Sequence, residues 1–373
     1  MTSPSHKKAA LAAACAVTLA CLSASAQAQS SVTLYGEIDA GLAYASNVGG
    51  HAQYQLTSGL IDGSFWGLQG SEDLGGGMKA LFRLERGLSL ANGEERNEHP
   101  YYVGLESESF GTLTLGRQYD SVHDYFAPFT LTGNAGGTAF AHPFDNDNAN
   151  NTYLAANAVK YASPKFGGFT FGGMYALSNG AGRFADNRAF SLGANYSGGA
   201  FSAGVAWLHN NGRGATGSGA YEPVALPGSG DVANSVIDTF VGKQDTIGVG
   251  ANYVIGDVIL GAAWSRAIQT GVVDADSGAG LPSIAFSNYE VNAVWQVTPA
   301  VSLAGMYVYT KASAAHWHEG AVQAVYQLSK RTDVYAETVY QRATAGAPAV
   351  INAFDPASGR NQLVVATGIR HRF

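Results

Sequence analysis

The chain has 373 residues, of which 28 are Asp or Glu and 21 are Lys or Arg, and charged residues make up only 13% of it. That share is about half of the roughly 25% found in soluble globular domains, which argues against the solvated surface of a soluble enzyme. An aromatic content of 11% and a hydrophobic content of 46% exclude a disordered chain. The mildly acidic balance makes nucleic acid a poor candidate for a partner.

The first residues have the layout of a secretory signal peptide. A basic start precedes an apolar run over residues 9–22, which is followed by small residues. The run is shorter than the about 20 residues that a membrane-spanning helix needs. We expect cleavage after Ala28, with Ala26 as the alternative, so residues 1–28 are the signal peptide and residues 29–373 the exported chain. Both cysteines lie in the signal peptide, so no disulfide is expected in the exported chain.

Period-two alternation dominates the exported chain and predicts β-strands. Within residues 288–297, Tyr289 and Val291 fall on an apolar face, and Asn288 and Glu290 fall on the opposite face. Comparable alternation occurs at residues 190–196, 246–253 and 322–328. Helical periodicity is weak throughout, so we expect an all-β fold.

Short and long connections alternate strictly along the chain. Seven short turns are predicted at residues 72–77, 107–111, 164–168, 198–199, 256–257, 298–300 and 329–331. Eight long polar connections are predicted at residues 46–62, 89–99, 119–156, 179–187, 210–243, 268–287, 311–318 and 343–360. Together they join sixteen antiparallel strands, with every long connection on the same side.

Three architectures could hold so many alternating strands: a sandwich, a propeller and a membrane barrel. A propeller requires a repeat of about 40–50 residues, which the sequence lacks. A sandwich has charged outer faces, whereas the second face here consists of Gly, Ser, Thr, Asn and Gln with few charges. Aromatic residues also gather at both ends of the strands. Two aromatic girdles, an even number of strands and short turns on one side indicate a closed outer-membrane β-barrel.

Six motifs spread over the exported chain point to a family. They are SVTLYG at residues 31–36, GLQGSEDLG at 67–75, KALFRLE at 79–85, FGTLTLGRQ at 110–118, VKYASP at 159–164 and GIRHRF at 368–373. Together they resemble the Gram-negative general porins, the trimeric sixteen-stranded type of beta-proteobacteria.

The resemblance implies a homotrimer in the outer membrane, in contact with lipid and lipopolysaccharide, without an enzymatic activity, a cofactor or a metal. Each barrel would be a passive, water-filled channel for ions and small hydrophilic solutes. The third long connection, residues 119–156, would fold inward and narrow the pore. The terminal Phe373 would be part of the signal for the barrel-assembly machinery. Independently of the family, sixteen strands predict a lumen that side chains cannot fill.

Alternation also predicts which charged side chains face the lumen, because the residues next to them on the strand are apolar and face outward. Arg117 has the parity of outward leucines, but it lies at a strand end, where alternation breaks. Asp120 and Asp124 lie where the third long connection leaves the wall. The predicted pore constriction consists of Tyr35, Asp39, Lys79, Arg83, Glu85, Arg117, Asp120, Asp124 and Lys160.

We expect Arg83 to face Asp120 and Asp124 and to create an electric field across the pore. Ion pairing that fixes the loop is the alternative role for these charges. Family members often carry basic residues where this chain has Phe65 and Gln69, so the sequence leaves both anion and cation selectivity open.

Other functions have less support. A substrate-specific channel on the same barrel is the alternative function. A barrel enzyme would need a Ser–His or Asp–His pair near one rim, and strand interiors contain His only near their ends. His316 and His318 have no third ligand at a metal-binding spacing, so we interpret them as residues of a long connection.

Overall fold

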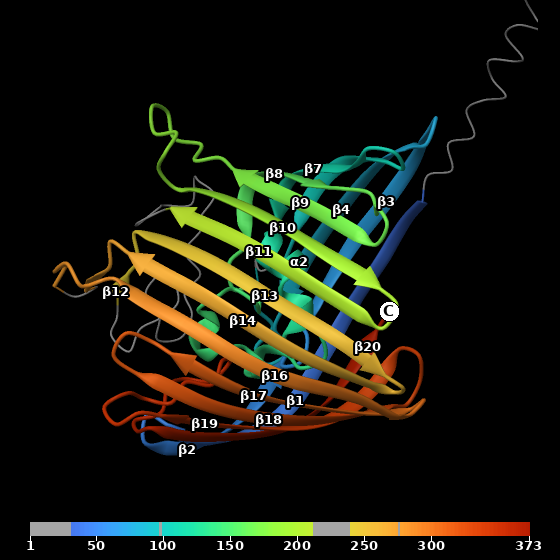
Figure 1. The fold of residues 1–373 in the computed structure, drawn as a ribbon. Helices are drawn as coiled ribbons and strands as arrows, with labels where there is room; N and C mark the ends of the chain where they lie inside the picture. The colour runs from blue at the N-terminus through green and yellow to red at the C-terminus, as the bar shows by residue number, and fades with distance from the viewer. Residues whose placement is uncertain (1–30, 97–98, 212–238, 275–276) are drawn as a thin grey trace, which may run out of the picture.

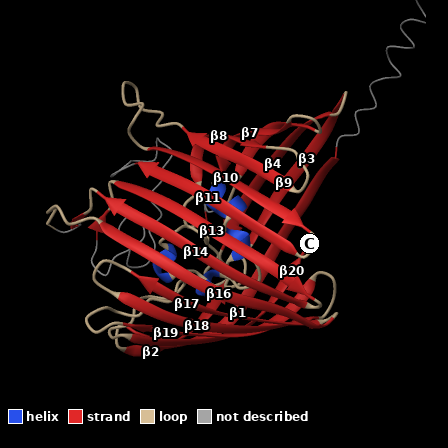
Figure 2. Cartoon of the chain, viewed as in Figure 1, coloured by secondary structure: helices blue, strands red, loops and turns tan. Residues whose placement is uncertain are grey.

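The computed structural model describes residues 31–96, 99–211, 239–274 and 277–373. The predicted signal peptide and its cleavage site lie outside the described residues. The chain forms one antiparallel sheet that closes on itself, because β1 pairs with β20 along Glu37–Ala45 (Figures 1 and 2). A second sheet contains only β12 and β15. In the described part of the chain, no helix is long and apolar enough to cross a membrane.

Eighteen strand segments make up the closed sheet. They are β1 (Ser31–Val48), β2 (His51–Ser58), β3 (Phe65–Gly75), β4 (Met78–Leu88), β5 (Glu95–Arg96), β6 (Tyr101–Ser107), β7 (Gly111–Gln118), β8 (Ala155–Ala162), β9 (Phe169–Ala176), β10 (Arg188–Gly198), β11 (Phe201–Asn211), β13 (Lys243–Ile255), β14 (Val258–Thr270), β16 (Ile284–Thr298), β17 (Val301–Lys311), β18 (His316–Gln327), β19 (Thr332–Ala343) and β20 (Asn361–Arg372). The two-stranded sheet pairs β12 (Thr239–Phe240) with β15 (Val273–Asp274). Two barrel strands are each built from two segments, β2 with β3 and β5 with β6, so the barrel has the predicted sixteen strands.

The alternation in the sequence becomes an alternation of burial. On β16, Tyr289 and Val291 are 51% and 58% exposed on the outside of the barrel, whereas Asn288 and Glu290 are buried on the inside. Apolar side chains face outward because the hydrocarbon of a bilayer solvates them, and polar side chains line the interior. The outward and inward faces predicted for this strand are therefore confirmed.

Several of the predicted long connections are wrong in their bounds. Residues 46–62 were expected to be a loop, but β1 continues to Val48, a tight turn follows at Gly49 and Gly50, and β2 pairs back onto β1. Both glycines have a positive φ, 58° and 103°, which such a hairpin turn requires. Likewise, residues 316–318 belong to β18. The predicted number of strands is still correct, because β2 and β3 are two segments of the same barrel strand.

The connection between β7 and β8, residues 119–154, lies inside the barrel, and we call it the lumen loop. It contains helix α2 (Ser121–Tyr125) and three short 3-10 helices, η1 (Ala127–Phe129), η2 (Thr138–Phe140) and η3 (Pro143–Asp145). Figure 2 shows these helices within the ring of strands. Val122, Phe126, Leu131 and Phe140 of this loop are fully buried, which explains why a polar-looking segment stays inside rather than on the surface.

Candidate functional site

A cavity of about 1100 Å³ runs between the lumen loop and the opposite wall. Its lining includes Gln296 and Gln327, which lie next to short turns, and Ala91 and Pro356, which lie in long connections. The cavity therefore extends from one end of the barrel toward the other. Such a passage, polar at both ends, can conduct water and dissolved solutes.

Glycines on the inner wall make room for the lumen loop. A Cβ at Gly193 or Gly204 would overlap Tyr125, and a Cβ at Gly248 would overlap the Phe126 ring. These glycines come from three consecutive barrel strands, β10, β11 and β13. The backbone of the loop can thus approach the wall closely, and its aromatic rings fill the space that the missing side chains leave.

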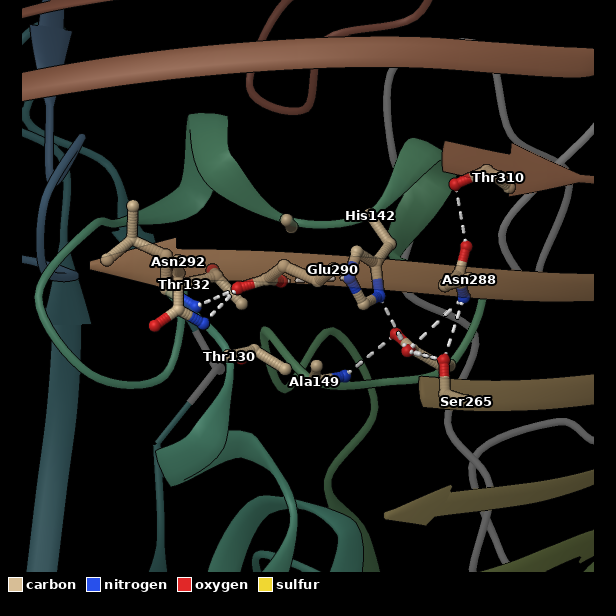
Figure 3. A network of polar contacts seen from close by, with 12 residues as sticks. Thr130, Thr132, His142, Ala149, Ser265, Asn288, Glu290, Asn292 and Thr310 are labelled. Carbon is tan, nitrogen blue, oxygen red and sulfur yellow. Dashed lines mark hydrogen bonds and ion pairs between the residues drawn. The ribbon is translucent and has the colours of Figure 1, made fainter. Parts of the chain in front are cut away.

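A buried imidazole joins the middle of the lumen loop to the wall (Figure 3). His142 Nδ1 lies 2.7 Å from Asp147 Oδ2, and His142 Nε2 lies 3.0 Å from Glu290 Oε2 on β16. Burial alone would lower the pKa of His142, but Asp147 and Glu290 together raise it well above 6.5. We therefore assign His142 as an imidazolium that donates to both carboxylates.

Both carboxylates of this group have further donors, so the buried charges are satisfied. Glu290 Oε1 accepts hydrogen bonds from the Leu131 backbone at 2.7 Å and from Asn292 Nδ2 at 2.6 Å. Asp147 accepts from Ser265 Oγ on β14. The result is a polar latch between the loop and two strands of the wall, which Figure 3 shows along β16.

The beginning of the lumen loop is fixed by predicted site residues. Lys160 Nζ on β8 lies 2.5 Å from Asp124 Oδ2 and donates to the Tyr119 carbonyl oxygen at 2.9 Å. Asp120 is fully buried, and its Oδ1 caps α2 by accepting from the Val122 backbone at 2.6 Å. Burial raises the pKa of Asp120 to about 6. Both aspartates thus hold the loop in place, which is the alternative role considered from the sequence.

Three predicted residues meet on the wall at β1 and β4. Arg83 pairs with Glu85, and Tyr35 Oη donates to Glu85 Oε1 at 2.5 Å. His99 Nδ1 lies 3.2 Å from the other oxygen of Glu85. No ion pair joins Arg83 to Asp120 or Asp124 among the interactions of the described chain, so the expected facing charges are not in contact.

The remaining predicted residues lie in different places. Asp39 is fully buried and accepts hydrogen bonds from the Ile61 backbone and Tyr335 Oη, both at 2.8 Å. Lys79 lies beside a short turn, 3.8 Å from Glu106. Arg117 lies at an irregularity in the pairing of β7 with β8, as its strand-end position suggested. Lys79 is therefore at the turn end of the barrel and not at its middle.

None of the nine predicted residues belongs to the lining of the cavity as the structure describes it. The charged side chains on that lining are Asp62, Glu94, Arg96, Arg370 and Arg372, joined by His99 and His123. Arg372 lies 2.8 Å from Glu37 and 2.9 Å from Asp333, and these two carboxylates are buried behind it. Alternation could have placed Arg370 and Arg372 on the inner face of the barrel. Ile369 of β20 is exposed on the outside, and the two arginines have the opposite parity on the strand.

Comparison with known proteins agrees with the closed barrel and its passage. The family model described as Gram-negative porin matches residues 10–346. The chain belongs to the Gram-negative porin family. An outer membrane porin protein of Bordetella pertussis is 29% identical, with 98% of this chain and all of the relative covered. Outer membrane porin protein 32 of Delftia acidovorans is 28% identical, with 96% and 99% covered.

Solved structures give the same result. The anion-selective porin from Comamonas acidovorans superposes with a TM-score of 0.73 at 25% identity, covering 92% of this chain and all of that one. This porin is accordingly a passive diffusion channel of the outer membrane. Porins are channels rather than enzymes, and the passage described above is the route that such a channel needs.

Proposed function

We propose that the lumen loop sets the size limit of this porin and that the arginines on the cavity lining set its selectivity. The supporting observation is the position of the loop, which packs against several parts of the inner wall and borders an elongated passage. In this proposal the predicted constriction residues do not contact the solute but position the residues that line the passage. Lys160 and Asp124 position the loop, and Arg83, Tyr35 and Glu85 position His99.

Deletion of residues 134–151 tests the size limit. The deletion removes His142, Phe140 and Phe144, and it joins Gly133 to Thr152, which both lie on the cavity lining. Single-channel conductance in planar bilayers should rise several-fold. The protein should keep the heat-modifiable electrophoretic mobility of a folded barrel. An unchanged conductance in a folded barrel would show that the loop does not limit the flow.

A preference for anions is the selectivity that the lining supports. Arg372 presents a 39% exposed side chain to the lumen, while its partners Glu37 and Asp333 are 8% and 3% exposed. The positive ends of these ion pairs thus point into the passage, and the related Comamonas porin is described as anion-selective. Reversal potentials in a KCl gradient at low ionic strength test this, and a potential of the cation-selective sign would refute it.

We also propose that three copies assemble into a trimer through the first strands. Val32, Leu34 and Leu42 of β1 are 65%, 59% and 64% exposed, and the Phe373 ring covers Gly36 between them. Apolar contacts of this kind suit the packing of one barrel on another. Cross-linking followed by mass measurement in mild detergent should give three chains, whereas a monomer would contradict the proposal.

Phe373 closes the barrel seam and carries the proposed assembly signal. Its backbone nitrogen donates to the Gly36 carbonyl oxygen at 3.0 Å, and Gly36 donates back to Phe373 at 3.2 Å. We propose that the barrel-assembly machinery binds the last strand through this residue before the seam closes. Removal of Phe373 should lower the amount of folded porin in the outer membrane without changing export. Lipopolysaccharide is the proposed lipid neighbour.

A further inference from the structure

Two stacked aromatic rings of the lumen loop lie on the lining of the passage. The ring centroids of Tyr119 and His123 are 4.1 Å apart, the angle between the ring planes is 22°, and both residues line the cavity. Tyr119 lies just before the N-cap of α2, and His123 lies within this helix. The side chain of His123 is 35% exposed. The lumen loop therefore presents a flat aromatic surface to solutes in the passage.

Polar contacts hold this stack in a fixed orientation. His123 Nδ1 lies 3.1 Å from Asp124 Oδ1, and Lys160 both pairs with Asp124 and donates to the Tyr119 carbonyl oxygen. Asp120, between the two rings in sequence, caps α2. A surface that is already ordered binds a solute at a lower entropic cost than a mobile one. The stack is thus suited to binding and not only to filling space.

A second pair of rings lies near the first. His99, which is also on the lining, packs against Phe65 with ring centroids 4.9 Å apart and an angle of 32° between the planes. His99 Nδ1 lies 3.2 Å from the buried carboxylate of Glu85. Burial raises the pKa of the Tyr119 phenol above its usual value, and the charge of Glu85 raises it further. Because such an electrostatic effect decreases with distance, both pairs of rings border the same part of the passage.

Two arginines of the wall lie beside these rings. The carboxylate of Asp62 also acts on the Tyr119 phenol, and Asp62 Oδ2 lies 3.6 Å from Arg370 Nη1. Arg370 and Arg372 share the buried carboxylate of Asp333, at 3.2 and 2.9 Å. Asp62 and both arginines are on the lining. The part of the passage that contains the aromatic stack therefore also contains guanidinium groups.

We propose that this part of the passage binds aromatic carboxylates, with the ring on Tyr119 and His123 and the carboxylate on Arg370 and Arg372. The inference rests on the proposed anion preference and adds the planarity of the solute as a second criterion. A planar ring stacks on aromatic side chains, and a guanidinium matches the geometry of a carboxylate. A saturated ring acid of equal charge and similar size gains only the second interaction. The channel should distinguish the two solutes.

Block of the single-channel KCl current in planar bilayers tests this inference, because a solute bound in the passage reduces the current whatever the ion selectivity. The probes are benzoate and cyclohexanecarboxylate. Benzoate should halve the wild-type current at a concentration on the order of threefold to tenfold lower, as expected for one aromatic contact. Equal half-blocking concentrations would overturn the proposal. Benzamide, which lacks the charge, should block more weakly than benzoate, and equal block by benzamide would also overturn it.

A double variant tests the residues. Tyr119→Leu/His123→Gln should make the half-blocking concentrations of benzoate and cyclohexanecarboxylate equal. The matched control is Tyr54→Leu/His51→Gln, which removes an exposed tyrosine and an exposed histidine of β2 that are not on the lining, and it should keep the wild-type ratio. A loosened loop would change both half-blocking concentrations alike, so their ratio reports stacking. An unchanged ratio in the first variant would refute the assignment. If that variant does not fold, His123→Gln alone should lower the ratio.

A KCl gradient across the same channels tests the proposed anion preference separately. A reversal potential of the cation-selective sign together with preferential block by benzoate would refute the anion preference and support the aromatic site. A potential of the anion-selective sign together with equal block by both acids would refute the aromatic site alone.

Discussion

Lys160 Nζ lies 2.5 Å from Asp124 Oδ2, so a cation on the barrel wall holds the helix that begins the lumen loop. In the middle of the same loop, His142 binds Glu290 on a different part of the wall. The loop is therefore fixed at two separate places by charged groups, in addition to its aromatic side chains. This arrangement explains how a connection of more than thirty residues stays in a water-filled lumen.

Replacement of Lys160 by Met should loosen the beginning of the lumen loop. The substitution leaves the half-buried Asp124 without its lysine partner, which costs less than the about 3 kcal/mol of a fully buried pair. We expect a noisier and larger single-channel conductance. The double variant Lys160→Met/Asp124→Leu removes both charges and should restore a quiet channel, and failure of that rescue would argue against pairing as the role of Lys160.

The latch around His142 should weaken as the pH rises. A histidine whose pKa is raised by folding stabilises fully below its unfolded pKa of about 6.5, and this stabilisation is lost as the pH rises through the folded pKa. Burial raises the pKa of Asp145 in the same loop to about 7, so ionisation of Asp145 also disfavours the packed loop at higher pH. Conductance should therefore increase from acidic to alkaline pH.

Two variants separate these contributions to the pH dependence. Asp145→Asn should remove the change near pH 7, and His142→Gln should remove the change at higher pH while raising conductance at every pH. Recordings across the range from about pH 5 to about pH 10 provide the measurement. A wild-type conductance that decreases as the pH rises would contradict this account.

The Gly204→Ala substitution should displace the lumen loop without opening the barrel. The new Cβ would overlap the Tyr125 carbonyl oxygen and the Phe129 ring, and overpacking of this kind costs about 1–3 kcal/mol. Gly320→Ala on β18 is the control, because its Cβ would meet nothing within 4 Å. Conductance should rise only for the first variant, with unchanged heat-modifiable mobility for both.

Arg372→Gln should shift the reversal potential toward cations more than Arg83→Gln does. Arg372 is on the cavity lining, whereas Arg83 is not, and each is paired with a carboxylate that keeps other partners after the substitution. Measurement in a low-salt gradient minimises screening. If Arg83→Gln has the larger effect, the predicted field at Arg83 controls selectivity and the lining arginines do not.

The sequence predicted the all-β barrel, its sixteen strands and the inward face of most strands, because these properties depend on period-two alternation. A lipid-facing residue must be apolar whatever its neighbours in space are, so the pattern can be read one strand at a time. The hairpin at Gly49 and Gly50 was missed, although Tyr54 and Leu56 of β2 carry the same outward alternation. The error came from the polar residues between them, which resemble a loop.

Only the tertiary structure decided which charges line the passage and which ones hold the loop. Alternation places Arg83, Asp39 and Lys160 inside the barrel, but it gives neither their positions along the barrel axis nor the residues that they contact. Those depend on strand tilt and on the path of the lumen loop, which brings His142 against Glu290 across 148 positions of sequence. Pairing between residues so far apart in the sequence follows from packing in three dimensions, so local sequence patterns cannot predict it.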